Sequence, residues 1–345
     1  MVGRPLLAIV GVAAVLTGCG GSSVQAPTAR HPHATPSVSA HPHPARSPTV
    51  SAPAATSGQS ASPRGPLEIM VHPGARRTGT FGWRPAVSIR RQTALWISRV
   101  PARHLPGETV TLLRLDSRLV TLALHAGGSE PGGRGWRYGD AIRGAERGRV
   151  LAAFNSAFRE GYGAGGFAAG GRIGWRLRRG VASVVVYRDG GVEIGRWRVS
   201  VPAAGRPTAF VRQNLGLLIV GGRIASTVDT CIKVCWGDPL HEQPIVARSG
   251  LGITRRGELV WAAGYALSVR ALAQALARAG AVRAMELDIN PHWVAGYIYT
   301  HRRGTAAGPL ALVPGQTGIP GQFLTPYFRD FFSVLARRPA PERAG

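Results

Sequence analysis

Short segments of alternating apolar and polar residues, separated by turns that contain glycine, dominate the middle of this 345-residue chain. Such a period of two is typical of β-strands that are buried on one face. Gly257 lies between two further segments of this kind and predicts a hairpin turn in which the glycine takes a positive φ. The pattern therefore predicts a sheet-rich domain, with clear strands at residues 181–187, 192–199 and 215–220.

One helix is marked at both of its ends. Ser268 is a good N-cap, apolar residues follow it at helical spacing, and Gly280 stands where a helix commonly ends in a left-handed residue. A second, shorter helix is predicted over residues 326–336, where aromatic and aliphatic residues form an apolar stripe. With these helices the sequence predicts an α+β fold, a single sheet-rich domain of mixed or antiparallel strands and a few packed helices.

The N-terminus resembles a bacterial lipoprotein signal. An apolar stretch that is too short to span a bilayer follows Arg4, and small residues precede Cys19. In such a signal residues 1–18 are removed and Cys19 is lipidated, which anchors the protein on the outer side of the cell membrane. A plain secretory peptide is the alternative, and both interpretations predict export from the cytoplasm.

Composition divides the rest of the chain. Residues 19–65 are rich in Pro, Ser, Ala and His and contain no acidic residue, which predicts a disordered tether. We assign no metal site to its two His-Pro-His triplets, because a proline-rich spacer of this composition needs none. The folded domain is expected over residues 66–338, and a disordered tail over residues 339–345.

The chain is strongly basic, with 42 Lys and Arg against 17 Asp and Glu, a formal net charge of +25. All but one of the basic residues are arginines, and they are spread along the chain rather than gathered in runs. This usage is typical of GC-rich coding, as in actinobacteria, rather than of a nucleic-acid interface. We therefore expect an anionic surface or substrate as the partner, and no specific nucleic acid.

Two cysteines remain besides Cys19. In an exported protein the lone pair Cys231 and Cys235 predicts a disulfide. A metal site completed by Asp238 and His241 is the alternative, but the sequence has no second cysteine pair at metal-ligand spacing. No nucleotide-binding or zinc-protease motif occurs, so we expect no cofactor.

Two carboxylates carry the clearest chemical signal. Residues 281–289 alternate in polarity, so a strand there places Glu286 and Asp288 on one face. Close like charges raise the pKa of one carboxyl toward that of a general acid, and glycoside hydrolysis uses such a pair. Ion pairs with arginine are the alternative. Asn155, at the end of an apolar run, is either a functional strand-end residue or a turn former.

Three blocks of sequence resemble the phosphodiester glycosidase family. They are residues 152–158 with 165–167, residues 247–260, and residues 267–288. The order and spacing of the blocks carry the resemblance. The family includes enzymes that remove N-acetylglucosamine from phosphodiester-capped mannose. The chain departs from the family where Ser156 and Ala157 follow Asn155, and where Ile289 follows Asp288, because the family has glycines at these places.

The resemblance implies roles for three residues. Arg248 holds the phosphodiester anion, Asp288 acts at the anomeric carbon or on water, and Asn155 orients a sugar hydroxyl. Glu286 joins the catalytic candidates because of its place beside Asp288. A divalent cation near Asp288 has no support in the ligand spacing. The substrate-binding candidates added from position alone are Asn290 and His292.

Together these features predict an exported, membrane-anchored hydrolase that cleaves sugar-phosphate phosphodiester linkages in cell-envelope glycans. The alternative is a non-catalytic lipoprotein that binds an anionic cell-wall polymer and retains the glycosidase fold. Turnover that depends on Asp288 distinguishes the two.

Overall fold

The computed structural model describes residues 67–74, 81–163, 165–231, 233–238, 243–302, 305–318 and 321–338. The predictions of a lipoprotein signal, of lipidation at Cys19, of a tether and of a C-terminal tail fall on residues outside these ranges. Within the described ranges, no helix is long and apolar enough to cross a membrane.

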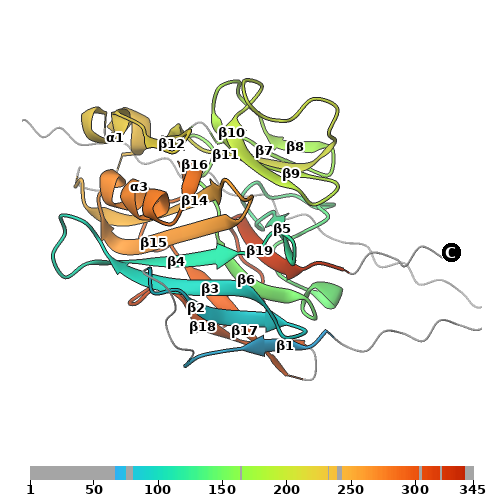
Figure 1. Cartoon of the computed structure of the whole chain (residues 1–345). Coiled ribbons are helices and arrows are strands. Elements are labelled where there is room, and N and C mark those ends of the chain that lie inside the picture. Colours follow the sequence, from blue (N-terminus) through green and yellow to red (C-terminus); the bar gives the residue numbers. More distant parts are fainter. Residues whose placement is uncertain are drawn as a thin grey trace, which may run out of the picture. The chain divides into compact units, whose positions relative to one another are not determined.

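The largest sheet has nine antiparallel strands (Figure 1). Its central hairpin has Gly257 in the turn at a φ of +80°, as the sequence predicts. In sheet order the strands are β1 (Ile69–Val71), β2 (Arg84–Ile89), β3 (Gln92–Pro101), β4 (Thr109–Leu115), β15 (Leu259–Leu267), β14 (Val246–Thr254), β16 (Ala281–Glu286), β12 (Leu217–Val220) and β13 (Arg223–Ile224).

Two further sheets have five antiparallel strands each. One of them consists of β10 (Val192–Arg196), β9 (Ala182–Tyr187), β11 (Thr208–Gln213), β7 (Phe167–Ala169) and β8 (Arg172–Trp175). The other consists of β18 (Thr305–Ala311), β17 (Gly296–Arg302), β6 (Val150–Asn155), β19 (Phe331–Ala336) and β5 (Val120–His125).

Helices are few and short among the described residues. The predicted helix is present as α3, in which the Ser268 hydroxyl accepts a hydrogen bond from the Ala271 amide at 3.1 Å and Gly280 has a φ of +94°. The prediction of an α+β fold is nevertheless wrong, because three antiparallel sheets make up most of the described domain. The helical segments are η1 (Gly144–Glu146), α1 (Thr227–Thr230), α2 (Lys233–Trp236) and α3 (Val269–Arg278).

The helix predicted over residues 326–336 is also wrong. Residues 331–336 form β19, which pairs on one side with β5 and on the other with β6. All six of its residues are buried, so apolar residues occupy successive positions and include the spacing of a helical stripe. Pairing with two neighbouring strands decides the structure here, since periodicity alone does not separate a doubly buried strand from a buried helix.

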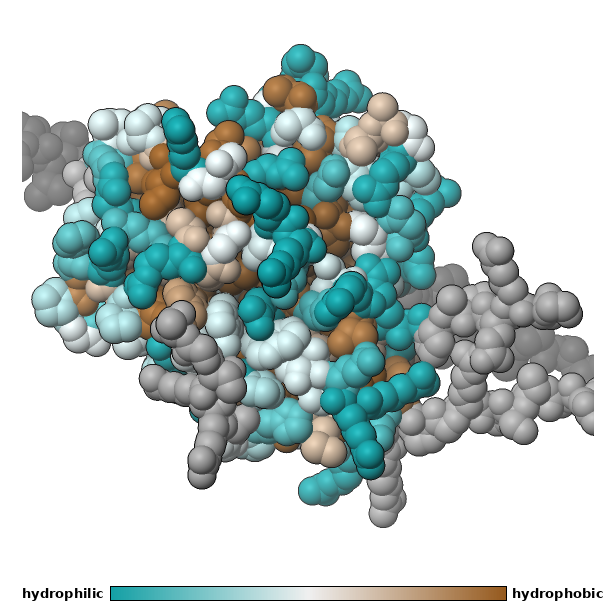
Figure 2. Space-filling view, in the orientation of Figure 1, coloured by the Kyte–Doolittle hydropathy of each residue, from teal (hydrophilic) through white to brown (hydrophobic). Residues whose placement is uncertain are grey.

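Alternate residues of the nine-stranded sheet enter two different cores. Leu113 and Trp261 pack toward the five-stranded sheets, whereas Leu112 and Val260 pack on the side that α3 covers. Successive side chains of a strand point to opposite faces, and each face of this sheet is covered by other elements. The sheet is therefore buried on both faces. Apolar residues that reach the surface are interspersed with hydrophilic ones on the face in Figure 2.

A disulfide joins Cys231 and Cys235 and confirms the predicted bond. The metal interpretation of these cysteines is wrong, because bonded sulfurs are not thiolate ligands. No group of His, Cys, Asp and Glu suited to a metal ion occurs in the described part of the chain. The disulfide is typical of proteins outside the cytoplasm.

Candidate active site

Strand pairing brings three distant segments to one edge of the sheets. Asn155 ends β6, and it pairs in register with Phe331, the first residue of β19. Glu286 ends β16, and the chain continues from there to Asp288. The segments meet at a narrow depression, which is lined by Asn155, Ser156, Ala157, Asp288, Trp293, Tyr327, Arg329 and Asp330.

Asp288 is fixed mainly through its backbone. Its amide donates to the hydroxyl of Ser249 at 3.1 Å, and its carbonyl accepts from the Ser249 amide at 2.8 Å. Its Oδ1 accepts from the amide of Asn290 at 2.9 Å. The carboxyl group of Asp288 is thus held in place at the depression, although the residue is only 3% exposed.

The surroundings of Asp288 raise its pKa. Burial raises this pKa to about 6, and the negative charge of Asp330 adds to the increase. The guanidinium of Arg329 opposes the increase, with its Nη2 3.2 Å from Oδ2 of Asp288. Asp288 can therefore take up or release a proton close to neutral pH.

Glu286 is a second buried carboxyl group with a raised pKa. Burial raises its pKa to about 7, the Arg248 guanidinium lowers it, and the charge of Asp288 raises it further. Its Oε1 accepts a hydrogen bond from Nη1 of Arg248 at 2.7 Å, whereas Oε2 has no hydrogen-bond partner among the described residues. The two carboxyl groups form an electrostatically coupled pair, although Glu286 does not line the depression.

Arg248 lies against Glu286 rather than at an open surface. Its guanidinium is fully buried and also donates to the carbonyls of Leu267 and Pro244, at 3.0 and 3.4 Å. This arrangement stabilises the ionised form of Glu286. Binding of a substrate anion by Arg248 stays a prediction.

The side chain of Asn155 links β6 to β14, a strand of the nine-stranded sheet. Its Nδ2 donates to the hydroxyl of Ser249 and to the carbonyl of Ser156, both at 2.8 Å. Its Oδ1 accepts from the amide of Ala295 at 3.4 Å. Asn155 therefore positions the backbone around Asp288, and its predicted contact with a sugar hydroxyl stays a prediction.

Asn290 and His292 lie in the turn that follows Asp288. The side-chain oxygen of Asn290 accepts from the amide of His292 at 2.9 Å, so this asparagine shapes the turn. Asn290 is half-buried and His292 is exposed. The structure thus brings both residues near Asp288, while their predicted contacts with substrate stay predictions.

Two further arginine–carboxylate pairs lie at the same edge and were not predicted from the sequence. Arg329 places its Nε 3.2 Å from Oε2 of Glu130 and donates from Nη2 to the Ala157 carbonyl at 3.0 Å. Arg212 donates to both carboxylate oxygens of Asp330, at 2.7 and 3.3 Å. The partners lie far apart in the chain, and the only local signal is that Arg329 and Asp330 directly precede a buried apolar run.

Several solved structures are similar to this one. The catalytic domain of zebrafish N-acetylglucosamine-1-phosphodiester alpha-N-acetylglucosaminidase, auto-inhibited by its pro-peptide, matches at 14% identity and a TM-score of 0.46, over 79% of this chain and 89% of that one. A hypothetical protein from Synechocystis matches at 12% identity and a TM-score of 0.39, over 73% of this chain and 65% of that one. No family model and no curated protein matches the sequence. The function is therefore inferred from the residues of this chain.

Proposed function

We propose that this protein is an exported, membrane-anchored hydrolase that cleaves glycosyl-1-phosphodiester linkages in cell-envelope glycans. The observation that carries the proposal is the coupled pair of buried carboxyl groups, with a pKa of about 7 for Glu286 and about 6 for Asp288. Raised pKa values in a charged cluster at strand ends are typical of catalytic sites. The resemblance of the three sequence blocks supports the substrate class, and the disulfide supports a location outside the cytoplasm.

In the proposed reaction, Asp288 removes a proton from water as the water attacks the anomeric carbon. The bond between this carbon and the phosphate oxygen breaks, and the phosphate monoester leaves with the electron pair. A phosphate leaving group needs little protonation, so one carboxyl group in contact with the reacting atoms is sufficient. Arg329 contacts Asp288 at the depression and can stabilise the negative charge of the phosphate.

Substrate entry requires a change at the rim of the depression. In this conformation the side chains leave no room for a water molecule there. Trp293 lies edge-on to the ring of Phe328, with the two ring centroids 5.0 Å apart. The guanidinium of Arg329 lies 5.3 Å from the centroid of the Trp293 ring. Phe328 is 44% exposed, so this aromatic pair can move without unfolding a core and can stack on a sugar ring.

Sugar release by the purified protein tests the proposal. We expect release from at least one member of a panel of sugar-1-phosphodiesters, and a decrease in kcat of at least about 100-fold in Asp288→Asn, because a general base contributes about that much. Asp229→Asn is the matched control, since this aspartate is exposed in α1 and pairs with Arg270 there. Release that is undiminished in a folded Asp288→Asn protein would remove this residue from the mechanism.

A non-catalytic polymer-binding protein is the second candidate. It is favoured by the closed depression and by the bonds that tie Arg248 and Asn155 to the protein itself. This function predicts no sugar release from any substrate, together with salt-sensitive binding of purified teichoic acid that is the same in wild type and Asp288→Asn.

A further inference from the structure

A cavity of about 790 Å³ lies at the opposite end of the strands from Asp288. In β19, Phe331 pairs with Asn155 at the candidate site, whereas Ala336 leads directly into Arg337 and Arg338, which line the cavity. At about 3.4 Å per residue, the six residues of β19 separate the two ends by roughly 17 Å. The cavity is thus distinct from the carboxylate site.

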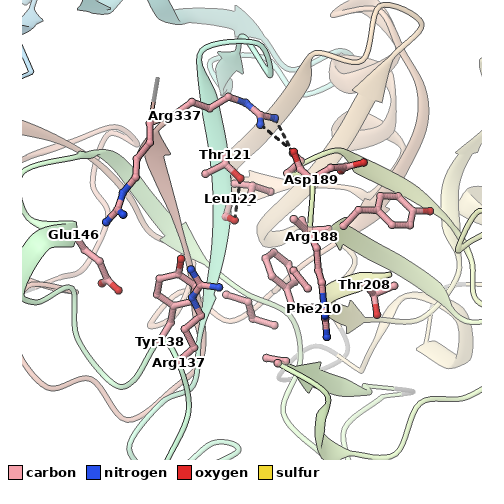
Figure 3. A pocket seen from close by; sticks show the side chains of 18 of the residues that line it. Thr121, Leu122, Arg137, Tyr138, Glu146, Arg188, Asp189, Thr208, Phe210 and Arg337 are labelled. Carbon is pink, nitrogen blue, oxygen red and sulfur yellow. Dashed lines mark hydrogen bonds between the residues drawn. The ribbon is translucent and has the colours of Figure 1, made fainter. Parts of the chain in front are cut away.

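Arginines gather around this cavity. Figure 3 shows Arg137, from the loop before η1, and Arg188, from the end of β9, on two sides of the open space. Apolar wall is contributed by Leu122 and Phe210. Among the described residues, two carboxylates line the cavity, Glu146 and Asp189, against six arginines, which are Arg137, Arg143, Arg149, Arg188, Arg337 and Arg338.

Some of these arginines are used by the protein itself. Arg337 donates to four backbone carbonyls, among them that of Gly190 at 2.7 Å. Arg149 donates to the carbonyl of Ala336, and Arg143 pairs with Asp140 at 2.9 Å. These contacts fix the walls of the cavity.

Other arginines at the cavity form no ion pair with a carboxylate of the described ranges. Arg188 and Arg338 are exposed, and within the described ranges their side chains make no hydrogen bond or ion pair. Arg137 is exposed and lies over the ring of Tyr138, with its Cζ 5.4 Å from the centroid. Their donors are therefore available to a ligand.

The carboxylates at the cavity offset only part of its positive charge. Burial lowers the pKa of Arg149 and the charges of Arg338 and Arg137 lower it further, whereas the charge of Glu146 raises it. Asp189 is occupied by Arg206, whose Nη2 lies 2.7 Å from Oδ2. The arginines thus repel one another, and an anion in the cavity relieves that repulsion.

We propose that this arginine-lined cavity binds a segment of an anionic phosphodiester polymer. Its volume is typical of ligand sites, and the planar guanidinium group is suited to phosphate oxygens. The concave shape favours a chain over a flat membrane surface, and the apolar wall can contact the uncharged part of each repeat. The proposal goes beyond hydrolysis at Asp288 and does not rest on it, because binding is measured without turnover.

Binding of the full chain to inorganic polyphosphate tests the site. We expect Arg137→Gln combined with Arg188→Gln to weaken binding about tenfold at low salt, because two phosphate contacts are lost. Each lost contact should also decrease the steepness of log K against log salt by about 0.7 to 0.9. The matched control is Arg103→Gln combined with Arg223→Gln, which removes two exposed arginines of the nine-stranded sheet, one in the turn after β3 and one in the edge strand β13. The control is expected to bind within about twofold of wild type, since it changes only net charge.

Three outcomes would overturn the proposal. Equal weakening in both double variants would mean that net charge alone attracts the polymer. Loss of binding in Asp288→Asn would place the polymer at the carboxylate site instead. A cavity variant that loses binding to vesicles of anionic lipid while it still binds polyphosphate would identify a membrane contact. Inactivity of wild type on sugar phosphodiesters, with polyphosphate binding intact and dependent on Arg188, would refute the hydrolase alone.

Discussion

Arginines at the two ends of the same strands differ in burial and in their contacts with carboxylates. At the end that holds Asp288, Arg212 and Arg329 are buried, and each contacts a carboxylate. At the other end, Arg137 and Arg188 are exposed and contact none among the described residues. The net charge of the chain therefore does not reveal which arginines are available to a ligand.

The cost of removing charge from water explains this difference. A buried guanidinium without a partner is strongly unfavourable, so those at the carboxylate end come with acids and backbone carbonyls. An exposed guanidinium keeps its hydration and needs no partner. The first group stabilises ionised carboxylates inside the protein, whereas the second group creates a positive field at the surface.

The largest effect is expected when a buried arginine is replaced. Arg212→Met leaves the fully buried Asp330 without its bidentate partner, and we expect the free energy of unfolding to decrease by about 3–5 kcal/mol. Unfolding in urea, followed by tryptophan fluorescence, measures this change. A decrease of less than about 1 kcal/mol would show that the carboxylate end tolerates unpaired charge. It would contradict the view that buried arginines there need carboxylate partners.

A smaller effect is expected in the pH dependence of stability. The pKa of Asp288 is about 6 in the folded protein against an ordinary value of 3.8, so the folded state binds the proton more tightly. Its stabilising contribution is complete below the lower value and is lost as pH rises through the higher one. Relative to wild type, Asp288→Asn should therefore gain up to about 3 kcal/mol of stability between pH 4 and pH 7.

The difference between the two proteins removes the contributions of groups that do not interact with Asp288. The pKa of Glu286 is lower in Asp288→Asn, because the charge of Asp288 raises it in wild type, and this change acts in the same direction. Burial lowers the pKa of His125 to about 3, and its contribution to stability rises with pH, but it is present in both proteins. Asp189→Asn at the cavity is the comparison variant, because hydrogen bonds from Gly191 and Arg206 lower the pKa of this exposed aspartate. Its effect should be small and of opposite sign, and a flat difference for Asp288→Asn would contradict the prediction.

The smallest effect is expected at the cavity. Arg188→Met removes an exposed side chain without an ion pair, so the free energy of unfolding should change by no more than about 0.5 kcal/mol. The same urea unfolding experiment measures it beside Arg212→Met. A typical substitution decreases the free energy of unfolding by about 1 kcal/mol. A decrease of about 2 kcal/mol or more in Arg188→Met would therefore mean that Arg188 supports the fold, and it would weaken the case for a ligand.

Local sequence signals predicted the elements that are delimited by capping residues or turn glycines. Ser268 and Gly280 marked α3, and Gly257 marked the hairpin between β14 and β15. Alternation marked β9 and β16, and placed Glu286 and Asp288 close enough to be coupled. These features depend on hydrogen bonds and backbone conformations within a few residues, so the sequence alone was sufficient for them.

The disulfide, the capped helix and the pair of neighbouring carboxylates were predictable from local sequence. The strand at residues 331–336, the pairing of Arg248 with Glu286 and the contact of Arg329 with Asp288 became known from the fold alone. It also separated the buried arginines from those of the cavity. The reason is physical: strand pairing and the burial of charge depend on partners that lie far away in the chain, and no local pattern specifies them.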